Sequence, residues 1–480
     1  MEDYRVRYQQ WLEDPFIDEE TKAELRSIAD NETEIKERFF KELEFGTGGL
    51  RGIIGNGSNR LNQYTVGKAS QGLANYILKE GTQDKGVAIA YDSRFMSPEF
   101  AEVAGLIFAA NGIPAFVYPS LRPVPMLSFA VRELGCTAGV VLTASHNPPE
   151  YNGYKVYWAD GAQVVAPRDK GIITEVNAVT DFGQIKRMDR AEAEAKKLFN
   201  LIGAEVDEAF DKNVQASLMN HEMIQRMGDK LNIVYTPLHG SGNMPVRRNL
   251  EKAGFKNVYI VKEQEAPDSS FSTVDYPNPE DTKVFVMAQE LAAKVDADIL
   301  IGTDPDCDRV GAMVKDDKGE FVALTGNHVG ALATEYILSQ RKAQGRLPEN
   351  GAVIKTIVST EMITPICEAY GVEKMDVLTG FKFIGEKIKG FEETGSHTFL
   401  YGFEESYGCL GGTYARDKDA VFASVLICEM AAYYKEKGMT LYEALLALYE
   451  KYGYFREGVK SLTMKGLEGM ERIQLIMKTF

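Results

Sequence analysis

The sequence predicts a multi-domain α/β protein in which three successive doubly wound α/β units surround a central cleft, followed by the start of a fourth domain. Three observations support this fold class. Short apolar runs alternate with helical patterns along most of the 480 residues, as in sheets that are covered by helices. This length is too great for one hydrophobic core. The most unusual polar residues directly follow apolar runs, where open α/β sheets place their ligands.

The first 45 residues are expected to form a helical N-terminal arm. Asn31 and Glu34 stand at the spacing of a capping box, and Ile35, Phe39 and Phe40 continue a helical apolar pattern behind them. We expect this arm to pack against the rest of the chain.

Residues 46–52 (GTGGLRG) form a glycine-rich loop with one arginine. The loop is not a P-loop, since no Gly-Lys-Ser/Thr follows, and Arg51 stands where a dinucleotide-binding fingerprint requires its third glycine. The glycines alone are compatible with a plain flexible turn. An arginine on such a loop can bind a phosphate through two hydrogen bonds, so Arg51 is a candidate phosphate ligand.

The first α/β unit is expected over residues 46–200, and its apolar strand over residues 138–142 ends in the segment 143–148, TASHNP. Two prolines stop any helix from continuing through this turn. The segment 151–155 is expected to turn back and bring Lys155 toward the same point. The other expected elements are a helix from Tyr64, a strand over 87–91, a helix over 98–111, a strand over 114–118 and a solvated helix face over 190–197.

Ser145 lies in this turn, where a parallel sheet would present a nucleophile. Read alone, the segment is equally compatible with a serine that caps a turn or a helix. Ser145 and His146 are not expected to form a hydrolase dyad, because neighbouring side chains on a turn generally diverge and no Gly-x-Ser-x-Gly elbow is present. A serine that carries a phosphoryl group agrees better with the rest of the chain.

A second unit is expected over residues 201–324 and a third over 325–453, each with polar residues after its strands. The predicted strands are 233–235, 257–261 and 299–301 in the second unit, and 353–358 and 398–401 in the third, which a helix over 441–452 follows. Residues 454–480 are expected to begin a fourth domain that is incomplete. Its expected elements are a strand over 458–463 and a final helix with the apolar stripe Ile473, Ile476, Met477 and Phe480.

Asp304, Asp306 and Asp308 alternate in one loop and offer enough carboxylate oxygen to bind a divalent cation. An EF-hand is excluded, since Arg309 replaces the required glycine and Lys315 replaces the bidentate glutamate. The alternative is a solvated acidic turn. Three carboxylates leave Mg²⁺ with open positions that phosphate oxygen can fill, and Arg309 would suit the same phosphate.

Polar residues after other strands are candidates for proton transfer or substrate binding. His146, Lys155 and Lys418 can move a hydroxyl proton or stabilise charge. Glu404 and Ser406 can hydrogen-bond vicinal hydroxyl groups. Each of these residues is by itself more often a surface or turn residue, so the pattern alone does not choose among them.

The composition excludes several classes of partner. The chain has 54 Lys and Arg against 70 Asp and Glu, and its net charge of -16 disfavours nucleic acid and anionic lipid. The start of the chain lacks the layout of a secretory signal, and the most apolar run, 421–434, is too short to span a bilayer. Five cysteines without close pairs predict reduced thiols in a cytoplasm. The oligomeric state stays open.

Together these segments resemble the α-D-phosphohexomutase family over nearly the whole chain. Residues 143–148 resemble its phosphoserine loop, 304–309 its metal loop and 402–406 its sugar-binding loop. They occur in the order of the family, with residues 46–52 in front. The long N-terminal arm and the amino-acid sequence of residues 43–52 are most similar to the bacterial phosphoglucomutase and phosphopentomutase branch.

This resemblance implies an intramolecular phosphotransferase that interconverts glucose 1-phosphate and glucose 6-phosphate through a phosphoserine and a bound glucose 1,6-bisphosphate. Pentose and mannose phosphates are alternative substrates, and a phosphosugar-binding protein with little turnover is the alternative from another class. Members of the family end in a domain whose Ser-Gly-Thr loop binds the phosphate group of the substrate that is not being transferred. No such loop follows Gly469 in this sequence, so we expect reduced turnover and leakage of the bisphosphate.

The resemblance also implies a role for each candidate residue. Ser145 would carry the phosphoryl group and complete the site in which Asp304, Asp306 and Asp308 bind one Mg²⁺. The other implied catalytic residues are His146, Lys155, Arg309 and Lys418, of which either lysine or the histidine could be the general acid or base. The implied substrate-binding residues are Arg51, Thr379, Gly380, Glu404 and Ser406.

Overall fold

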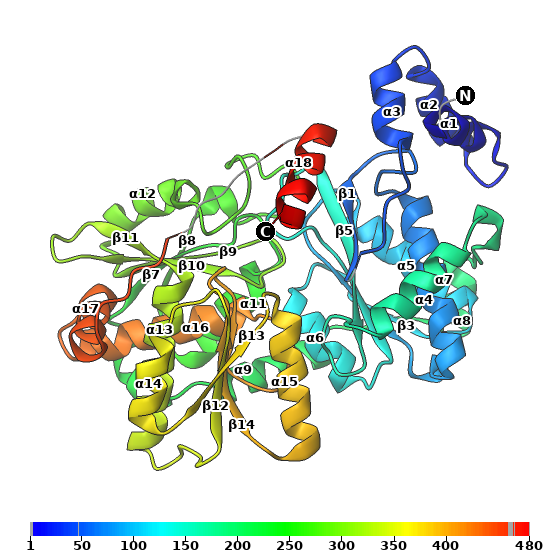
Figure 1. Cartoon of the computed structure of the whole chain (residues 1–480). Helices are drawn as coiled ribbons and strands as arrows, with labels where there is room; N and C mark the ends of the chain where they lie inside the picture. Colours follow the sequence, from blue (N-terminus) through cyan, green and yellow to red (C-terminus); the bar gives the residue numbers. More distant parts are fainter. Residues whose placement is uncertain (1–2, 47, 459–463, 465, 480) are drawn as a thin grey trace.

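The chain forms three α/β units, each with its own sheet, and a separate group of N-terminal helices (Figure 1). The computed structural model describes residues 3–46, 48–458, 464 and 466–479. All three sheets are mixed: parallel strands form the centre, and antiparallel strands lie toward one edge. Among the described residues, no helix combines the length and the hydropathy needed to cross a bilayer.

Three helices form the N-terminal arm, as predicted: α1 (Asp3–Glu13), α2 (Glu19–Ser27) and α3 (Glu32–Phe39). The side chain of Asn31 caps α3 by accepting a hydrogen bond from the backbone N–H of Glu34 at 3.2 Å. The Trp11 ring lies edge-on to the rings of Phe39, Tyr64 and Phe182, at centroid distances of 5.8, 5.5 and 5.4 Å. Aromatic packing thus joins the arm to the first unit.

The first unit has a six-stranded sheet in the order β1-β5-β4-β2-β3-β6. Its strands are β1 (Gly49–Ile53), β2 (Val87–Tyr91), β3 (Ala115–Val117), β4 (Ala138–Leu142), β5 (Tyr151–Trp158) and β6 (Phe199–Leu201), and its helices are α4 (Gln63–Glu80), α5 (Ser97–Ala110), α6 (Val124–Glu133), α7 (Arg168–Ala178) and α8 (Arg190–Ala195). The predicted turn over residues 151–155 was wrong. This segment extends into β5, because β4 on one side and β1 on the other supply antiparallel backbone partners.

The second unit has a five-stranded sheet in the order β11-β10-β9-β7-β8. Its strands are β7 (Asn232–Thr236), β8 (Asn257–Ile260), β9 (Ile299–Thr303), β10 (Val310–Lys315) and β11 (Phe321–Leu324), and its helices are α9 (Ala204–Ala216), α10 (His221–Met227), α11 (Asn243–Ala253) and α12 (Val286–Val295). Strands β9 and β10 form an antiparallel pair, so residues 304–309 are the loop of a hairpin.

The third unit has a four-stranded sheet in the order β13-β12-β14-β15. Its strands are β12 (Gly351–Thr356), β13 (Glu373–Val377), β14 (Thr398–Phe403) and β15 (Cys409–Leu410), and its helices are α13 (Gly326–Ala343), α14 (Ile363–Tyr370), α15 (Phe381–Thr394), α16 (Ala420–Glu436) and α17 (Leu441–Tyr452). Strand β12 ends two residues before the predicted end of 353–358. A turn begins there, closed by a 2.7 Å hydrogen bond between the hydroxyls of Thr356 and Ser359.

Helix α16 connects the second and third units. It packs on α10 and α11 of the second unit and on α13 and β15 of the third. Its carboxylate at Glu429 is fully buried and accepts hydrogen bonds from the backbone N–H groups of Met219 and Asn220 and from the hydroxyl of Tyr336. One continuous hydrophobic core therefore runs through both units.

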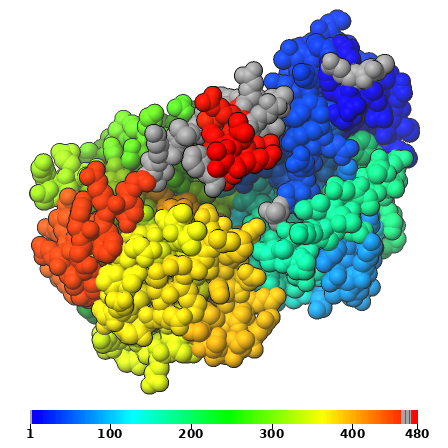
Figure 2. Space-filling view, in the orientation of Figure 1, coloured from blue at the N-terminus to red at the C-terminus, as the bar shows by residue number. Residues whose placement is uncertain are grey.

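The last described element is α18 (Gly466–Thr479). Figure 2 shows this helix on the surface, in red, between the second unit and the N-terminal part of the first. The predicted stripe residues Ile473, Ile476 and Met477 are 42%, 36% and 75% exposed, and Phe480 lies outside the described residues. The predicted strand over 458–463 also falls on residues that the structure does not describe, apart from residue 458.

Candidate active site

Ser145 is buried in the turn that follows β4, in a left-handed conformation with φ of 54°. Its hydroxyl donates a hydrogen bond to Asp304 Oδ2 at 2.9 Å and lies 3.2 Å from His146 Nδ1. The expected divergence of the Ser145 and His146 side chains was therefore wrong. The left-handed backbone at Ser145 reverses the local course of the chain and leaves the imidazole beside the hydroxyl.

The three predicted aspartates form one carboxylate cluster on the β9–β10 hairpin. One oxygen from each of Asp304, Asp306 and Asp308 can be chosen so that all three lie within 4.8 Å of one another. Asp304 Oδ1 accepts hydrogen bonds from the backbone N–H groups of Asp308 (3.1 Å) and Arg309 (3.0 Å), which keeps the loop tight. The sequence therefore folds these carboxylates inward and not into a solvated turn.

This cluster fits a divalent cation. Asp306 Oδ1 and Asp308 Oδ1 are buried and accept no hydrogen bond from the described residues. Buried oxygen atoms without partners are costly, and hard oxygen ligands are those that Mg²⁺ and Ca²⁺ prefer. The cluster thus has both the donor atoms and the uncompensated charge that a cation would satisfy.

The three carboxylates of the cluster change one another's pKa values. Burial, followed by the neighbouring carboxylates, raises the pKa of Asp304 well above its usual range, and burial together with Asp306 raises the pKa of Asp308. Burial alone would also raise the pKa of Asp306, but its ion pair with Lys155 outweighs burial and lowers that pKa. Asp306 is therefore the carboxylate that stays ionised most readily.

Two predicted lysines meet the cluster from other units. Lys155 Nζ, on β5, lies 2.8 Å from Asp306 Oδ2. Lys418 Nζ, in the loop before α16, lies 3.1 Å from Asp308 Oδ2 and 3.1 Å from Asp417 Oδ1. Burial opposes the charge on Lys418, but the carboxylates of Asp308 and Asp417 raise its pKa above the ordinary value. Lys418 is therefore held as a cation.

The pKa of His146 is lowered, whereas that of Lys418 is raised. Burial first, and then the positive charge of Arg309, lower the pKa of His146 to about 3. The imidazole is therefore neutral at physiological pH.

The two predicted arginines contact different loops: Arg51 contacts the serine loop (residues 143–148), and Arg309 contacts Asp308 of the carboxylate cluster. Arg309 forms ion pairs with Glu280 at 2.5 Å and, more loosely, with Asp308 at 3.8 Å. Arg51 is exposed on β1, and its Nη1 is 3.5 Å from Asn147 Oδ1 in the serine loop. The positive charges of both arginines act on His146, the neighbour of Ser145, and lower its pKa.

The predicted sugar-binding residues lie at the carboxyl edge of the third sheet. Strands β12, β13 and β14 are parallel, so the loops that follow β13 and β14 share this edge. The backbone N–H of Gly380 donates a 3.0 Å hydrogen bond to Glu404 Oε1, which joins the two loops. Thr379 is exposed, Ser406 is partly exposed, and the charge of Glu404 acts on Lys418. The edge therefore connects to the carboxylate cluster through Lys418.

Sequence reasoning missed residues that position this site. Arg94 donates hydrogen bonds to backbone carbonyls of the serine loop, and the Tyr157 hydroxyl donates to Asp417 Oδ2 at 2.6 Å. Arg94 could have been found, since it follows a buried strand as the other site residues do. Nothing in the local sequence marks Tyr157, because its partner is 260 residues away.

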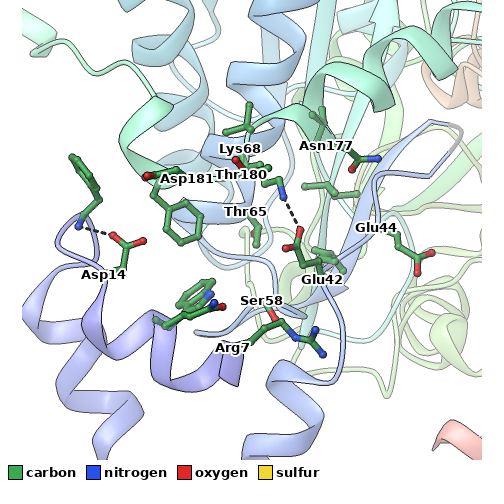
Figure 3. Close-up of a pocket in the computed structure, with 18 of the residues that line it drawn as sticks. Arg7, Asp14, Glu42, Glu44, Ser58, Thr65, Lys68, Asn177, Thr180 and Asp181 are labelled. Carbon is green, nitrogen blue, oxygen red and sulfur yellow. Dashed lines mark hydrogen bonds and ion pairs between the residues drawn. The ribbon is translucent and has the colours of Figure 1, made fainter. Parts of the chain in front are cut away.

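A cavity of about 520 Å³ lies away from these residues, between the N-terminal arm and the first unit (Figure 3). Its wall includes Trp11, Phe182 and the 2.6 Å ion pair of Lys68 with Glu42. None of the predicted site residues lines it. The volume of a cavity therefore does not locate the chemistry in this molecule.

The fold and the site define an α/β enzyme for phosphoryl transfer, because a buried hydroxyl faces a carboxylate cluster and is surrounded by cationic groups. Three family models match the chain: the phosphoglucomutase/phosphomannomutase α/β/α domain I over residues 42–182, domain II over 209–319 and domain III over 325–452. The chain therefore belongs to the phosphoglucomutase/phosphomannomutase family of intramolecular phosphotransferases. The predicted family is confirmed.

Individual relatives agree with this assignment. The chain is 36% identical to a phosphoglucomutase of Staphylococcus epidermidis, over 98% of this chain and 84% of that protein. It is 38% identical to a phosphoglucomutase of Staphylococcus aureus, over 94% of this chain and 79% of the relative.

Solved structures share the fold. A phosphoglucomutase/phosphomannomutase family protein from Burkholderia thailandensis matches with a TM-score of 0.65 at 19% identity, over 85% of this chain and 80% of that one. The open form of a Paramecium phosphoglucomutase, parafusin, matches with a TM-score of 0.66 at 18% identity, over 86% and 75% of the two chains.

Proposed function

We propose that this protein is a phosphoglucomutase that interconverts glucose 1-phosphate and glucose 6-phosphate through phospho-Ser145 and a bound glucose 1,6-bisphosphate. The observation that carries the proposal is the 2.9 Å contact of Ser145 Oγ with Asp304, beside two buried carboxylate oxygens, Asp306 Oδ1 and Asp308 Oδ1, that accept no hydrogen bond from the described residues. The relatives named phosphoglucomutase support the choice of substrate.

In the first transfer, the 6-hydroxyl oxygen of glucose 1-phosphate attacks the phosphorus on Ser145. The bond between phosphorus and Oγ breaks, the hydroxyl loses its proton, and the serine oxygen regains one. In the second transfer, Ser145 Oγ loses its proton and attacks the phosphorus on O1 of the bisphosphate, the bond between phosphorus and O1 breaks, and O1 takes up a proton. Between the two transfers the bisphosphate turns over, so the net reaction moves the phosphate between C1 and C6.

His146 is our choice for the proton that Ser145 loses. The choice rests on geometry: in the tautomer protonated on Nε2, its Nδ1 can accept a proton from Oγ at 3.2 Å. Lys155 and Lys418 instead act as fixed cations that stabilise the transferred phosphoryl group. Arg309 and Arg51 would bind the same phosphate through their guanidinium groups.

Asp304, Asp306 and Asp308 would hold one Mg²⁺, with the serine oxygen or its phosphate as a further ligand. When bound, the ion supplies charge neutralisation for the transferred group. Thr379, Gly380, Glu404 and Ser406 would bind the sugar hydroxyls, with Glu404 fixed by the Gly380 N–H. We further propose a cytoplasmic location, which five buried free cysteines support.

A coupled assay tests the proposal. The purified chain, Mg²⁺ and a trace of glucose 1,6-bisphosphate should convert glucose 1-phosphate into glucose 6-phosphate, and Ser145→Ala should abolish the conversion. Mannose 1-phosphate and ribose 1-phosphate are run in parallel. A faster rate with either would replace glucose as the assigned substrate, and no turnover with any of them would favour a phosphosugar-binding protein.

A further inference from the structure

The serine loop is held from behind by one buried arginine. The Arg94 side chain is fully buried, and its Nη1 donates to the carbonyls of Pro148 and Tyr151, both at 2.8 Å. Its Nη2 donates to the carbonyls of Ser145, at 2.6 Å, and Asn147. Four carbonyl groups, three in the serine loop and one at the start of β5, thus bind one guanidinium.

Four carbonyl groups that meet at one point need a donor with several N–H groups. Buried carbonyl groups that lack a partner destabilise a fold, and only the fork of an arginine offers enough N–H groups in one plane to satisfy four of them. Because the carbonyl of Ser145 itself is among them, Arg94 restrains the residue that bears the reacting oxygen.

Asp92 completes the support. It lies 3.5 Å from Arg94 Nε, and its Oδ2 accepts a 2.5 Å hydrogen bond from the Thr143 hydroxyl. The Thr143 oxygen in turn accepts a 2.8 Å hydrogen bond from the backbone N–H of Ser145. Arg94 and Asp92 therefore fix both backbone groups of Ser145. Arg94 binds its carbonyl directly, and Asp92 holds its N–H through the Thr143 hydroxyl.

A residue of the second unit packs against the Arg94 guanidinium. The Phe271 ring is fully buried and lies 5.1 Å from the Arg94 guanidinium carbon, in the geometry of a cation–π contact. The loop that carries Ser145 is thereby backed by a group that touches the unit carrying Asp304.

We propose that Arg94, held by Asp92, is a positioning residue that keeps Ser145 Oγ in line with the carboxylate cluster for phosphoryl transfer. This inference rests on the proposed function for its kinetic effect, but its structural part can be measured separately. Arg94 contacts the backbone of the loop and not the reacting atoms, so its loss should affect the rate of transfer more than the binding of metal.

The test uses Arg94→Ala and Arg94→Lys in the full chain. The rate at which glucose 1,6-bisphosphate phosphorylates Ser145 should fall roughly 100-fold in Arg94→Ala, since a displacement of about 1 Å costs that much. Arg94→Lys should recover little, because an ammonium cannot bond four carbonyls in a plane. Guanidinium chloride at low concentration, compared with sodium chloride, should restore part of the rate in Arg94→Ala.

Arg60→Ala is the matched control. Arg60 is also buried and bonds backbone carbonyls, those of Glu37 and Asn59, but in a different loop. It should keep the labelling rate within about threefold and show no rescue by guanidinium. Equal losses in Arg60→Ala and Arg94→Ala, or a normal rate in a folded Arg94→Ala protein, would overturn the proposal.

Hydrogen exchange of residues 143–152 gives the second readout. These amides should exchange at least tenfold faster in Arg94→Ala than in the wild type, and guanidinium should slow them again.

If the wild type is not labelled by the bisphosphate, the proposed function fails, and exchange alone decides the role of Arg94. If Arg94→Ala does not fold, the pair Asp92→Asn with Arg94→Ala removes the unpaired carboxylate and is measured instead. Unchanged exchange in a folded variant contradicts the inference.

Discussion

Three buried carboxylates within 4.8 Å of one another repel each other, and two cations, Lys155 and Lys418, offset only part of that repulsion. A divalent cation should therefore stabilise the fold as well as the reacting phosphate. This stabilisation depends on the number of charges in the cluster and not on the identity of the sugar.

Asp308→Asn tests the argument. Removing one charged ligand should weaken Mg²⁺ binding about tenfold or more, because affinity follows the number of charged ligands. It should also reduce the rise in melting temperature that Mg²⁺ produces. Titration calorimetry and thermal melts with and without Mg²⁺ measure both. Asp317→Asn, an exposed aspartate of the same unit, should leave both unchanged, and wild-type affinity in Asp308→Asn would show that the cluster is not the metal site.

Single residues of the site differ in how far sequence can predict them. Asp304, Asp306 and Asp308 are neighbours in sequence, so their grouping could be predicted without a fold. The bond of Arg94 to the loop and the Tyr157 to Asp417 contact depend on how distant segments meet. The Ser145 to His146 contact was wrongly excluded, because a left-handed φ at a non-glycine residue leaves no local signal.

At the scale of elements, close helix packing depends on particular glycines. A Cβ added to Gly72 on α4 would lie 2.5 Å from the Val176 backbone on α7. Gly390 on α15 has no atom within 4 Å of such a Cβ. The two positions make a matched pair inside helices.

Gly72→Ala should destabilise the protein by about 1–3 kcal/mol through overpacking against backbone. Gly390→Ala should stabilise it by about 0.5–1 kcal/mol, because alanine loses less backbone entropy in a helix. Urea unfolding followed by circular dichroism measures both. Equal changes in the free energy of unfolding, with the same sign in both variants, would show that a methyl group fits between α4 and α7 without strain.

Helix α16 carries a buried acid that should make stability depend on pH. Burial raises the pKa of Glu429 to about 7 from an ordinary 4.5, and the titratable group that faces it is Tyr336. The folded state therefore holds a proton that the unfolded state releases between pH 4.5 and 7. Stability from this group is full below pH 4.5 and is lost as the pH rises through 7, by about 3 kcal/mol in total.

Glu429→Gln should remove this pH dependence, since the amide keeps an oxygen for the N–H groups of Met219 and Asn220. Unfolding free energies at pH 5 and pH 8 should differ less in the variant than in the wild type. Glu290→Gln, an exposed glutamate on α12, serves as the control. A pH slope in Glu429→Gln equal to that of the wild type would contradict the burial argument.

At the scale of the whole molecule, the site is assembled from three units. Ser145 and Lys155 come from the first, the aspartates from the second and Lys418 from the third. Sequence predicted three α/β units because the apolar runs and helical patterns repeat. It could not predict that α16 packs on the second unit, since the apolar run 421–434 shows burial but not its partner. Nor did it predict the antiparallel strands β5 and β10, whose residues would also suit parallel pairing.

The central claim is that Ser145 carries the phosphoryl group, and peptide mass mapping tests it most directly. The protein is incubated with glucose 1,6-bisphosphate and Mg²⁺, digested and mapped. We expect one phosphate on the peptide that contains residues 143–148, located on Ser145, and none in Ser145→Ala. A phosphate on another residue, or labelling that persists in Ser145→Ala, would contradict it.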